Sequence, residues 1–249
     1  MAINQTYLDK KFIQEKVLRR PSDKNLYLLA GILFPLIVFV GYFKTYYFSA
    51  FFDVPHVANN LVHLHGIVMS VWVLYFTAQV ALARTKNIKL HRTLGFVGIG
   101  LAALVVIVGL ATAYDSHVVR HVAPAGIHPY SFLVIPFGDL AFFILALSGA
   151  IYYRKRPAEH KALMFMTAIN FAAPALARIP VVPPDYFLLW AFGFPCVLAI
   201  TALAWNTYKH GKLNKIFALA VTVFVILQPT RILFGGTEIW LNLMTKIFG

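Results

Sequence analysis

The chain has 249 residues, of which 60% are hydrophobic and only 12% are charged, with a mean hydropathy of +0.73. This composition excludes an ordinary water-soluble domain, because such domains carry about twice that share of charged residues. The formal net charge is +13, but the basic residues are distributed as in a membrane protein, so we expect a lipid bilayer and no nucleic acid as partner.

Residues 1–25 are expected to form a cytoplasmic amphipathic lead-in, because apolar side chains recur there among basic ones. Residues 26–234 then hold seven continuous apolar stretches of about the 20 residues that a transmembrane helix needs. The fold class expected is all-α integral membrane. The predicted spans are Leu26–Phe43, Leu61–Ala83, Leu94–Tyr114, Tyr130–Tyr153, Ala162–Ile179, Tyr186–Tyr208 and Ile216–Phe234. Residues 235–249 are expected to form an amphipathic tail on the outer surface.

The basic residues indicate the orientation. Seventeen of the 22 Lys and Arg residues lie before the first span or in the second, fourth and sixth connections, which the positive-inside rule assigns to the cytoplasm. They are Lys10, Lys11, Lys16, Arg19, Arg20, Lys24, Arg84, Lys86, Lys89, Arg92, Arg154, Lys155, Arg156, Lys161, Lys209, Lys212 and Lys215. We therefore expect the N-terminus inside, the C-terminus outside and a bacterial inner-membrane location.

Two hairpins resemble each other. Leu90-His91-Arg92-Thr93-Leu94 precedes the third span, and Glu159-His160-Lys161-Ala162-Leu163 precedes the fifth. A parallel duplication of helix pairs 2–3 and 4–5 is therefore expected.

Six of the nine histidines cluster at the outer face, and imidazole is the commonest metal ligand. The candidate metal ligands are His63, His65, Asp115, His117, His121 and His128. His65 begins a stripe that continues through Met69, Trp72, Phe76 and Gln79. If the third span continues as an α-helix past Tyr114, His117 and His121 stand at i and i+4. A depth difference of about 10 Å between His65 and His117 favours a small ion over haem. The alternative is that these are interfacial histidines with structural roles.

Two arginines, Arg178 and Arg231, are expected in the outer leaflet, where a charge needs a partner or a cavity. Asp139 is the expected ion-pair partner of Arg178. Arg231 has only Glu238 as a nearby candidate partner, and a propionate, phosphate or carboxylate of a bound molecule would satisfy it. Together with His65, His117 and His121, these arginines form the candidate cofactor-binding set.

Short motifs connect the chain to known proteins. Leu64-His65-Gly66, Trp72, Gln79, Leu90-His91-Arg92, Gly138-Asp139 and Glu159-His160-Lys161 resemble the pattern of a widespread group of bacterial seven-span membrane proteins of unassigned activity. Locally, His160-Lys161-x-Leu163-Met164 is similar to a motif of membrane proteins that assist haem-copper oxidase assembly, and His91-Arg92-x-Leu94-Gly95 is similar to one in haem-binding membrane reductases. The resemblance implies that His65, His91, His117 and His160 are candidates for a functional role, although His91 and His160 also suit headgroup contacts.

The expected function is therefore that of a membrane redox protein or redox-complex factor that binds a transition metal or b-type haem and serves electron transfer. The first alternative is a non-catalytic subunit or assembly partner of a larger respiratory or photosynthetic membrane complex. The second is a small-anion transporter or receptor.

Overall fold

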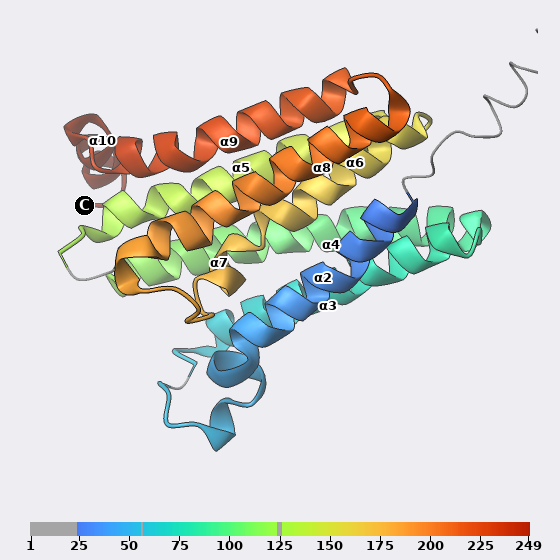
Figure 1. The fold of residues 1–249 in the computed structure, drawn as a ribbon. Coiled ribbons are helices and arrows are strands. Elements are labelled where there is room, and N and C mark those ends of the chain that lie inside the picture. Colours follow the sequence, from blue (N-terminus) through green and yellow to red (C-terminus); the bar gives the residue numbers. More distant parts are fainter. Residues whose placement is uncertain (1–23, 56, 124–125) are drawn as a thin grey trace, which may run out of the picture.

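The computed structural model describes residues 24–55, 57–123 and 126–249, and all regular elements in these ranges are helical (Figure 1). The predicted lead-in 1–25 lies almost entirely outside them, as does His56. In chain order the elements are α2 (Lys24–Tyr42), η1 (Phe43–Tyr47), η2 (Ser49–Phe51), α3 (Asn60–Arg84), α4 (Ile88–Tyr114), η3 (Asp115–Val119), α5 (Pro129–Tyr152), α6 (Pro157–Asn170), α7 (Ala173–Leu176), η4 (Pro184–Tyr186), η5 (Leu189–Gly193), α8 (Phe194–His210), α9 (Lys215–Gly235) and α10 (Glu238–Phe248).

Six helical segments among the described residues are long and apolar enough to cross a membrane. They are Asn25–Tyr47, Asn60–Arg84, Ile88–Val119, Pro129–Tyr152, Pro184–His210 and Lys215–Gly235. Large apolar side chains point away from the bundle along these helices, for example Phe96 at 77% exposure and Leu145 at 67%. Water would penalise such a surface, whereas lipid tails solvate it. The chain is a multi-pass membrane protein.

Asparagine caps set the start of three helices. The side-chain oxygens of Asn59, Asn87 and Asn214 accept hydrogen bonds from backbone N–H groups three residues further on, at the starts of α3, α4 and α9. Each bond satisfies one of the N–H groups that a helix leaves free in its first turn. The short connections α3–α4 and α8–α9 are thereby closed by polar residues.

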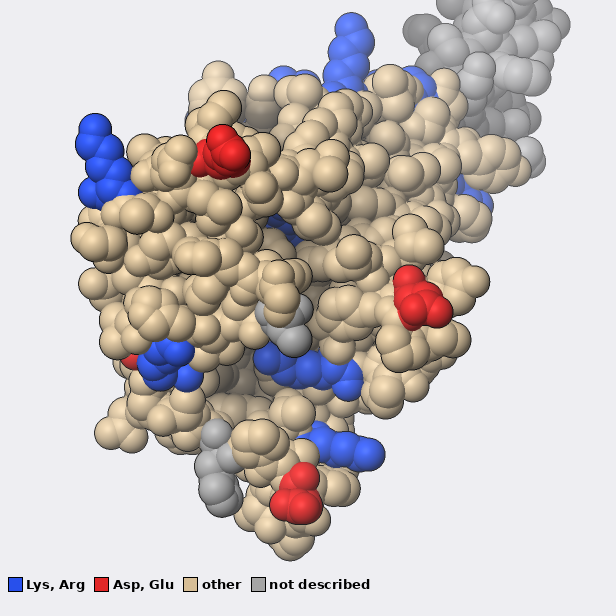
Figure 2. Space-filling model, turned by 90° about the vertical axis from the view of Figure 1, so that its left-hand side faces the viewer, with Lys and Arg blue, Asp and Glu red and all other residues tan. Residues whose placement is uncertain are grey.

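The basic connections lie together at one end of the bundle. The turns between α3 and α4, α5 and α6, and α8 and α9 all stand at the right-hand side of Figure 1, and we call this the basic end. The opposite end carries α10 and the C-terminus. Seen from that side, charged side chains of both signs are separated by uncharged surface (Figure 2).

Helix α5 lies at the centre of the bundle and contacts α4, α6 and α9. Phe142 and Ala146 of α5 pack in one core cluster with Met166 of α6 and Phe224 of α9. Phe143, on the neighbouring face of α5, packs in a second cluster with Trp72 of α3. The two clusters meet at α5, which therefore joins the hairpins on either side of it.

The predicted span Ala162–Ile179 does not form one long helix. Helix α6 ends at Asn170, and after a two-residue turn the short α7 begins at Ala173. Pro174 explains the break, because it has no N–H to donate to the carbonyl of Asn170 and its ring would clash with the preceding turn. This segment is consequently not among the six long apolar helices.

Two helices extend beyond the predicted ends of their spans. After Tyr42 and after Tyr114 the chain continues for five residues as a π-helix, through Tyr47 and Val119 respectively. A π-helical turn is wider than an α-helical one, so side chains past these points leave the expected i, i+4 register.

Candidate functional site

A half-open cavity of about 300 Å³ lies between the helices toward the basic end, and we call it the basic-end cavity. Helices α2, α3, α4, α5 and α6 form its wall, which is mostly apolar. Its polar and charged lining residues are Tyr27, Trp72, Tyr75, Gln79, Arg84, His91, His160 and Lys161. A few polar groups in an apolar cavity of this size are typical of a ligand site.

One face of α3 forms a long side of this cavity. Trp72, Tyr75, Phe76 and Gln79 line it at spacings of three and four residues, which places them on one stripe of the helix. Trp72, Phe76 and Gln79 are buried, as expected for a stripe that faces the bundle interior. A Cβ at position 98 of α4 would overlap the Tyr75 hydroxyl, so a larger residue there would displace the Tyr75 ring.

A hydrogen-bond relay fixes the orientation of the Gln79 amide. The Gln79 Nε2 donates to the Tyr75 hydroxyl at 2.8 Å, and that hydroxyl donates its single hydrogen to the Leu94 carbonyl oxygen at 2.9 Å. The Gln79 amide must therefore present nitrogen to Tyr75. Its oxygen, Oε1, is buried without a hydrogen-bond partner, and so is the indole Nε1 of Trp72.

Two histidines meet at the same cavity. The ring centroids of His91 on α4 and His160 on α6 are 6.4 Å apart, and their planes are nearly perpendicular at 87°. The Nδ1 of His91 is buried without a hydrogen-bond partner. The two rings come from the corresponding positions of the two similar hairpin motifs.

The tautomer of His160 follows from its hydrogen bond. Its Nδ1 lies 2.9 Å from the carbonyl oxygen of Ala150, which can only accept, so Nδ1 carries the hydrogen. In neutral His160, Nε2 therefore carries no hydrogen and has a free lone pair. A backbone carbonyl that orients an imidazole in this way is the usual outer support of a metal-binding histidine. Met164 also lines the cavity, one helical turn beyond His160 on the same face of α6.

Cationic side chains flank the cavity at the basic end. Arg84 and Lys161 are among its lining residues, and the Lys161 Nζ lies 5.2 Å from the centroid of the Tyr27 ring. None of its lining residues is acidic. A cationic ligand would therefore be repelled by Arg84 and Lys161, and neutral histidines would not offset this repulsion, so such a ligand would depend on direct coordination by their ring nitrogens.

The outer-face histidines on α3 lie in separate environments. His63 is exposed, and its Nδ1 lies 3.2 Å from the Tyr46 hydroxyl. His65 has a buried Nδ1 without a hydrogen-bond partner and lies close enough to Arg178 for that charge to act on its ring. His65 is therefore the member of the predicted metal set that has a ring nitrogen available in the interior.

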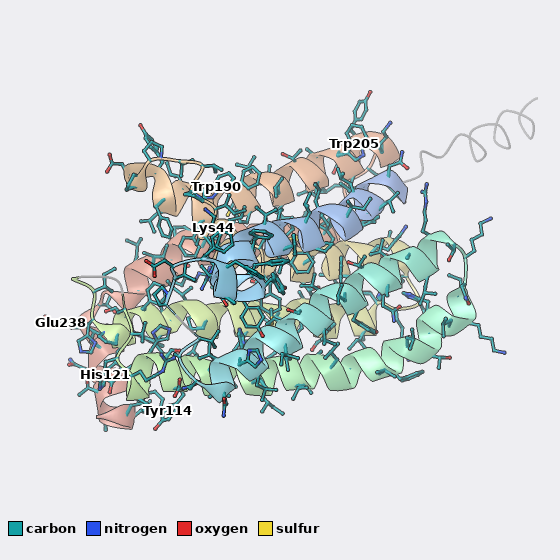
Figure 3. All side chains as sticks on the ribbon, turned by 90° about the horizontal axis from the view of Figure 1, so that it is seen from below. Lys44, Tyr114, His121, Trp190, Trp205 and Glu238 are labelled. Carbon is teal, nitrogen blue, oxygen red and sulfur yellow. The ribbon has the colours of Figure 1, made fainter. Side chains whose placement is uncertain are left out.

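Past α4, the remaining predicted ligands are engaged locally. The Nδ1 of His117 lies 2.6 Å from the Val122 carbonyl oxygen, and Asp115 accepts hydrogen bonds from Arg120 and Asn59. His121 lies beyond the π-helix η3 with a left-handed φ of 51°, so the predicted i, i+4 pair with His117 is wrong. It lies at the end of the bundle opposite the basic end, where Figure 3 also labels Tyr114 and Glu238.

His128, the last member of the set, caps α5 by accepting from the N–H of Tyr130 at 3.2 Å. Within the described ranges no group of three or more His, Cys, Asp or Glu side chains is arranged to hold a metal ion. Metal binding at the outer face stays a prediction.

The predicted Asp139–Arg178 ion pair is replaced by another. Asp139 on α5 pairs with Arg231 on α9, and both residues are buried, at 6% and 3% exposure. Arg231 also donates to Gln228 and to the Ile135 carbonyl oxygen, and its guanidinium lies over the Phe192 ring. Asp139 thus supplies the negative charge expected from a bound cofactor.

Arg178 lies elsewhere because the helix break at Pro174 directs the chain toward α2. Its guanidinium lies over the Tyr42 ring at 4.5 Å and donates to the Pro174 carbonyl oxygen at 2.7 Å. The arginine is exposed, and its guanidinium is engaged by an aromatic ring and a backbone carbonyl oxygen rather than by a carboxylate.

Comparisons with family models, curated proteins and solved structures find no match for this chain. The class of protein is therefore defined by the fold alone, as a multi-pass helical membrane protein.

From the sequence, His91 and His160 are expected to contact lipid headgroups, because each begins its span beside a basic residue. The signal that pointed to them was the repeated His-basic-x-Leu motif. A repeat of this kind predicts that corresponding residues occupy equivalent positions, and here those positions lie on the wall of the same cavity.

Proposed function

We propose that this is a seven-span bacterial inner-membrane redox protein or redox-complex factor that binds a transition-metal ion through His91 and His160. The observation that carries the proposal is the pair of imidazole rings, 6.4 Å apart, on the wall of the basic-end cavity. The proposal moves the expected site from the outer face to the cytoplasmic side of the bundle.

The gathering of the three basic connections at one end supports an orientation with that end in the cytoplasm. Helix α2 begins at the same end, so its N-terminus faces the cytoplasm, and the C-terminus after α10 lies outside. In this topology α6 and α7 together make the fifth crossing, as a broken helix between α5 and α8. Broken helices are tolerated in membranes where other helices surround them, and α6 is buried over most of its length.

The hairpins α3–α4 and α5–α6 are proposed to derive from a parallel duplication. Each pairs a helix that descends to the basic end with one that returns, and His91 and His160 stand near the starts of the returning helices. A duplicated unit of this kind supplies one ligand from each copy, which is how internal repeats often build a shared central site.

The ligand chemistry favours a soft ion such as copper(I). Two imidazoles and the thioether of Met164 offer two nitrogens and one sulfur, and thioether ligands select copper(I) over harder ions. All three side chains are neutral, so an ion of low charge is favoured, since Arg84 and Lys161 already bring positive charge to the cavity. Haem is the alternative cofactor, and an optical spectrum distinguishes it from a single ion.

The outer-face histidines are the second candidate for the metal site, because the Nδ1 of His65 is buried and unpartnered. A non-catalytic subunit or assembly partner of a larger respiratory or photosynthetic complex is the alternative function if neither site binds metal. The small-anion transporter or receptor is the second alternative; of its two arginines, Arg231 is paired with Asp139, whereas Arg178 donates to the Pro174 carbonyl oxygen.

The test is metal content in protein purified without chelator and loaded anaerobically with copper(I). We expect one ion per chain, and we expect His160→Asn to lose it. Asparagine places an amide N–H near the position of Nδ1, so the bond to Ala150 is kept while Nε2 is removed. His91→Asn is the second variant.

His65→Ala and His121→Ala are the matched controls and should retain the ion. If these two lose copper while His160→Asn and His91→Asn keep it, the metal site belongs to the outer face. If the wild type binds no stoichiometric metal or haem, the proposed function is wrong.

A further inference from the structure

The wall of the basic-end cavity changes in character along its length. Its two cationic lining residues stand at the basic end, since Arg84 is the last residue of α3 and Lys161 lies in the second turn of α6. Further into the bundle, most of the lining side chains are apolar, among them Phe76, Leu147 and Met164. The cavity therefore joins a cationic end to an apolar interior.

The two cations have no carboxylate partner among the described residues. Arg84 is exposed, and Lys161 is half-buried with its Nζ 5.2 Å from the centroid of the Tyr27 ring. The turns at 84–93, 154–161 and 209–215 contain a single acidic residue, Glu159, and it pairs with Arg156. An anionic group at this end of the cavity would meet two positive charges and no competing carboxylate.

The cavity is long relative to its volume. The lining residues Tyr75 and Arg84 are nine residues apart on α3, and His91 and Ile99 are eight apart on α4, which corresponds to about 12 to 14 Å along each helix axis. A volume of about 300 Å³ over such a length suits a narrow hydrocarbon chain. Ile99 is also 46% exposed, so the wall on the α4 side reaches the lipid-facing surface of the bundle.

Other classes of ligand match only part of this wall. A neutral lipid fills the apolar interior but leaves Arg84 and Lys161 without a counter-charge, and a free phosphate ion pairs with them but leaves the interior unfilled. A cationic amphiphile is repelled by both residues. An anionic lipid matches both parts, because its headgroup lies at the level of the helix ends and its chains point toward the middle of the bilayer, as the cavity does.

We propose that the basic-end cavity binds one anionic membrane lipid, whose phosphate contacts Arg84 and Lys161 and one of whose acyl chains lies in the apolar interior. The second chain remains in the surrounding bilayer. Basic loops attract anionic lipids in many membrane proteins, whereas this site selects for charge and chain together. The inference goes beyond the proposed metal site and does not depend on it.

The experiment is native mass spectrometry of the metal-free, full-length protein, delipidated in detergent and titrated with dioleoyl phosphatidylglycerol. Dioleoyl phosphatidylcholine has the same chains without a net charge, and glycerol 3-phosphate has the phosphate without the chains. We expect the first phosphatidylglycerol to bind at least about tenfold more tightly than the first phosphatidylcholine. Glycerol 3-phosphate at equal concentration should not compete with it.

Two variants test the headgroup contacts. Arg84→Gln and Lys161→Gln each remove one charge and keep a polar side chain, so each should weaken phosphatidylglycerol binding about fivefold and leave phosphatidylcholine binding unchanged. The matched control combines Arg154→Gln with Lys212→Gln, because both residues are exposed at the basic end and neither lines the cavity. It removes two charges from the same end and should change phosphatidylglycerol binding by less than about twofold, since exposed charges are screened.

Two glycines of α4 test the position of the acyl chain. Gly95 lines the cavity, and a Cβ there meets nothing within 4 Å, so the position has room for a larger side chain. Gly95→Leu should displace the acyl chain and weaken phosphatidylglycerol binding at least about fivefold. A Cβ at Gly100 also meets nothing within 4 Å, but Gly100 does not line the cavity, so Gly100→Leu is the control and should bind like the wild type.

The lipid measurement and the proposed function fail separately. A wild type that binds no copper refutes the proposed function and leaves the lipid result, obtained without metal, unaffected. Equal affinity of the wild type for phosphatidylglycerol and phosphatidylcholine would overturn the inference. The same loss of affinity in the surface control as in Arg84→Gln and Lys161→Gln, or unchanged phosphatidylglycerol binding in Gly95→Leu, would overturn it as well.

Discussion

At the scale of single residues, the bundle interior contains a buried ion pair and several buried polar atoms that have no hydrogen-bond partner. Asp139 and Arg231 neutralise each other, and Gln228 accepts a further hydrogen bond from the guanidinium. Trp72 and Gln79 keep one buried polar atom each without a hydrogen-bond partner, and so do Gln228 and Arg231. A buried carboxylate–guanidinium pair of this kind is typical of a structural element.

The Asp139–Arg231 pair leads to a test of stability. Arg231→Met leaves a buried carboxylate without its cation and should destabilise the protein by about 3–5 kcal/mol, and Asp139→Leu should do the same for the arginine. The double variant should lose much less than the sum of the two, as measured by denaturant unfolding in mixed micelles.

Arg178→Met combined with Asp139→Leu is the control, because the structure separates these residues and their effects should add. Strong coupling between positions 139 and 178, with none between 139 and 231, would support the pair expected from the sequence instead.

At the scale of elements, the break between α6 and α7 determines how the neighbouring helices pack. After the break, the backbone of Ala175 in α7 approaches α2 so closely that a Cβ at position 41 would overlap the Ala175 carbonyl group. Helices α2 and α7 are thus held together by a backbone contact that only glycine permits. This contact also fixes the direction in which Arg178 leaves the bundle.

Gly41→Ala should therefore destabilise the protein by about 1–3 kcal/mol, because the two backbones must separate to admit the methyl group. Gly100→Ala is the matched control, since a Cβ at that helical position meets nothing within 4 Å. Alanine there should be neutral or stabilise by up to about 1 kcal/mol. Equal unfolding midpoints for both variants would contradict the close approach of α2 and α7.

At the scale of the whole molecule, the sequence predicted the helical class and the apolar segments well, since hydropathy depends on local composition. Six of the seven predicted spans correspond to long helices. The exception is the predicted span Ala162–Ile179, which is broken at Pro174, because the effect of a proline on helix length depends on the surrounding packing. Side-chain pairing was harder to predict. Asp139 faces α9 rather than Arg178 because the packing of α5 against α9 decides its partner, and neither composition nor spacing contains that information.

The proposed orientation is a prediction at this scale. Reporter fusions at positions 86, 155 and 212 should be active in the cytoplasm, and a fusion after Gly249 should be active outside, because basic connections stay inside. A cytoplasmic C-terminus, with the three loops also inside, would mean that α6 and α7 do not cross the membrane.

The most direct test of the central claim is X-ray absorption at the copper edge of protein loaded with copper(I). A site built from two histidines and Met164 should give nitrogen scatterers at about 2.0 Å and one sulfur at about 2.3 Å, with the sulfur signal lost in Met164→Leu and the bound copper lost in His160→Asn. Bound copper whose spectrum has no sulfur scatterer and does not change in either variant would contradict a metal site at the basic end.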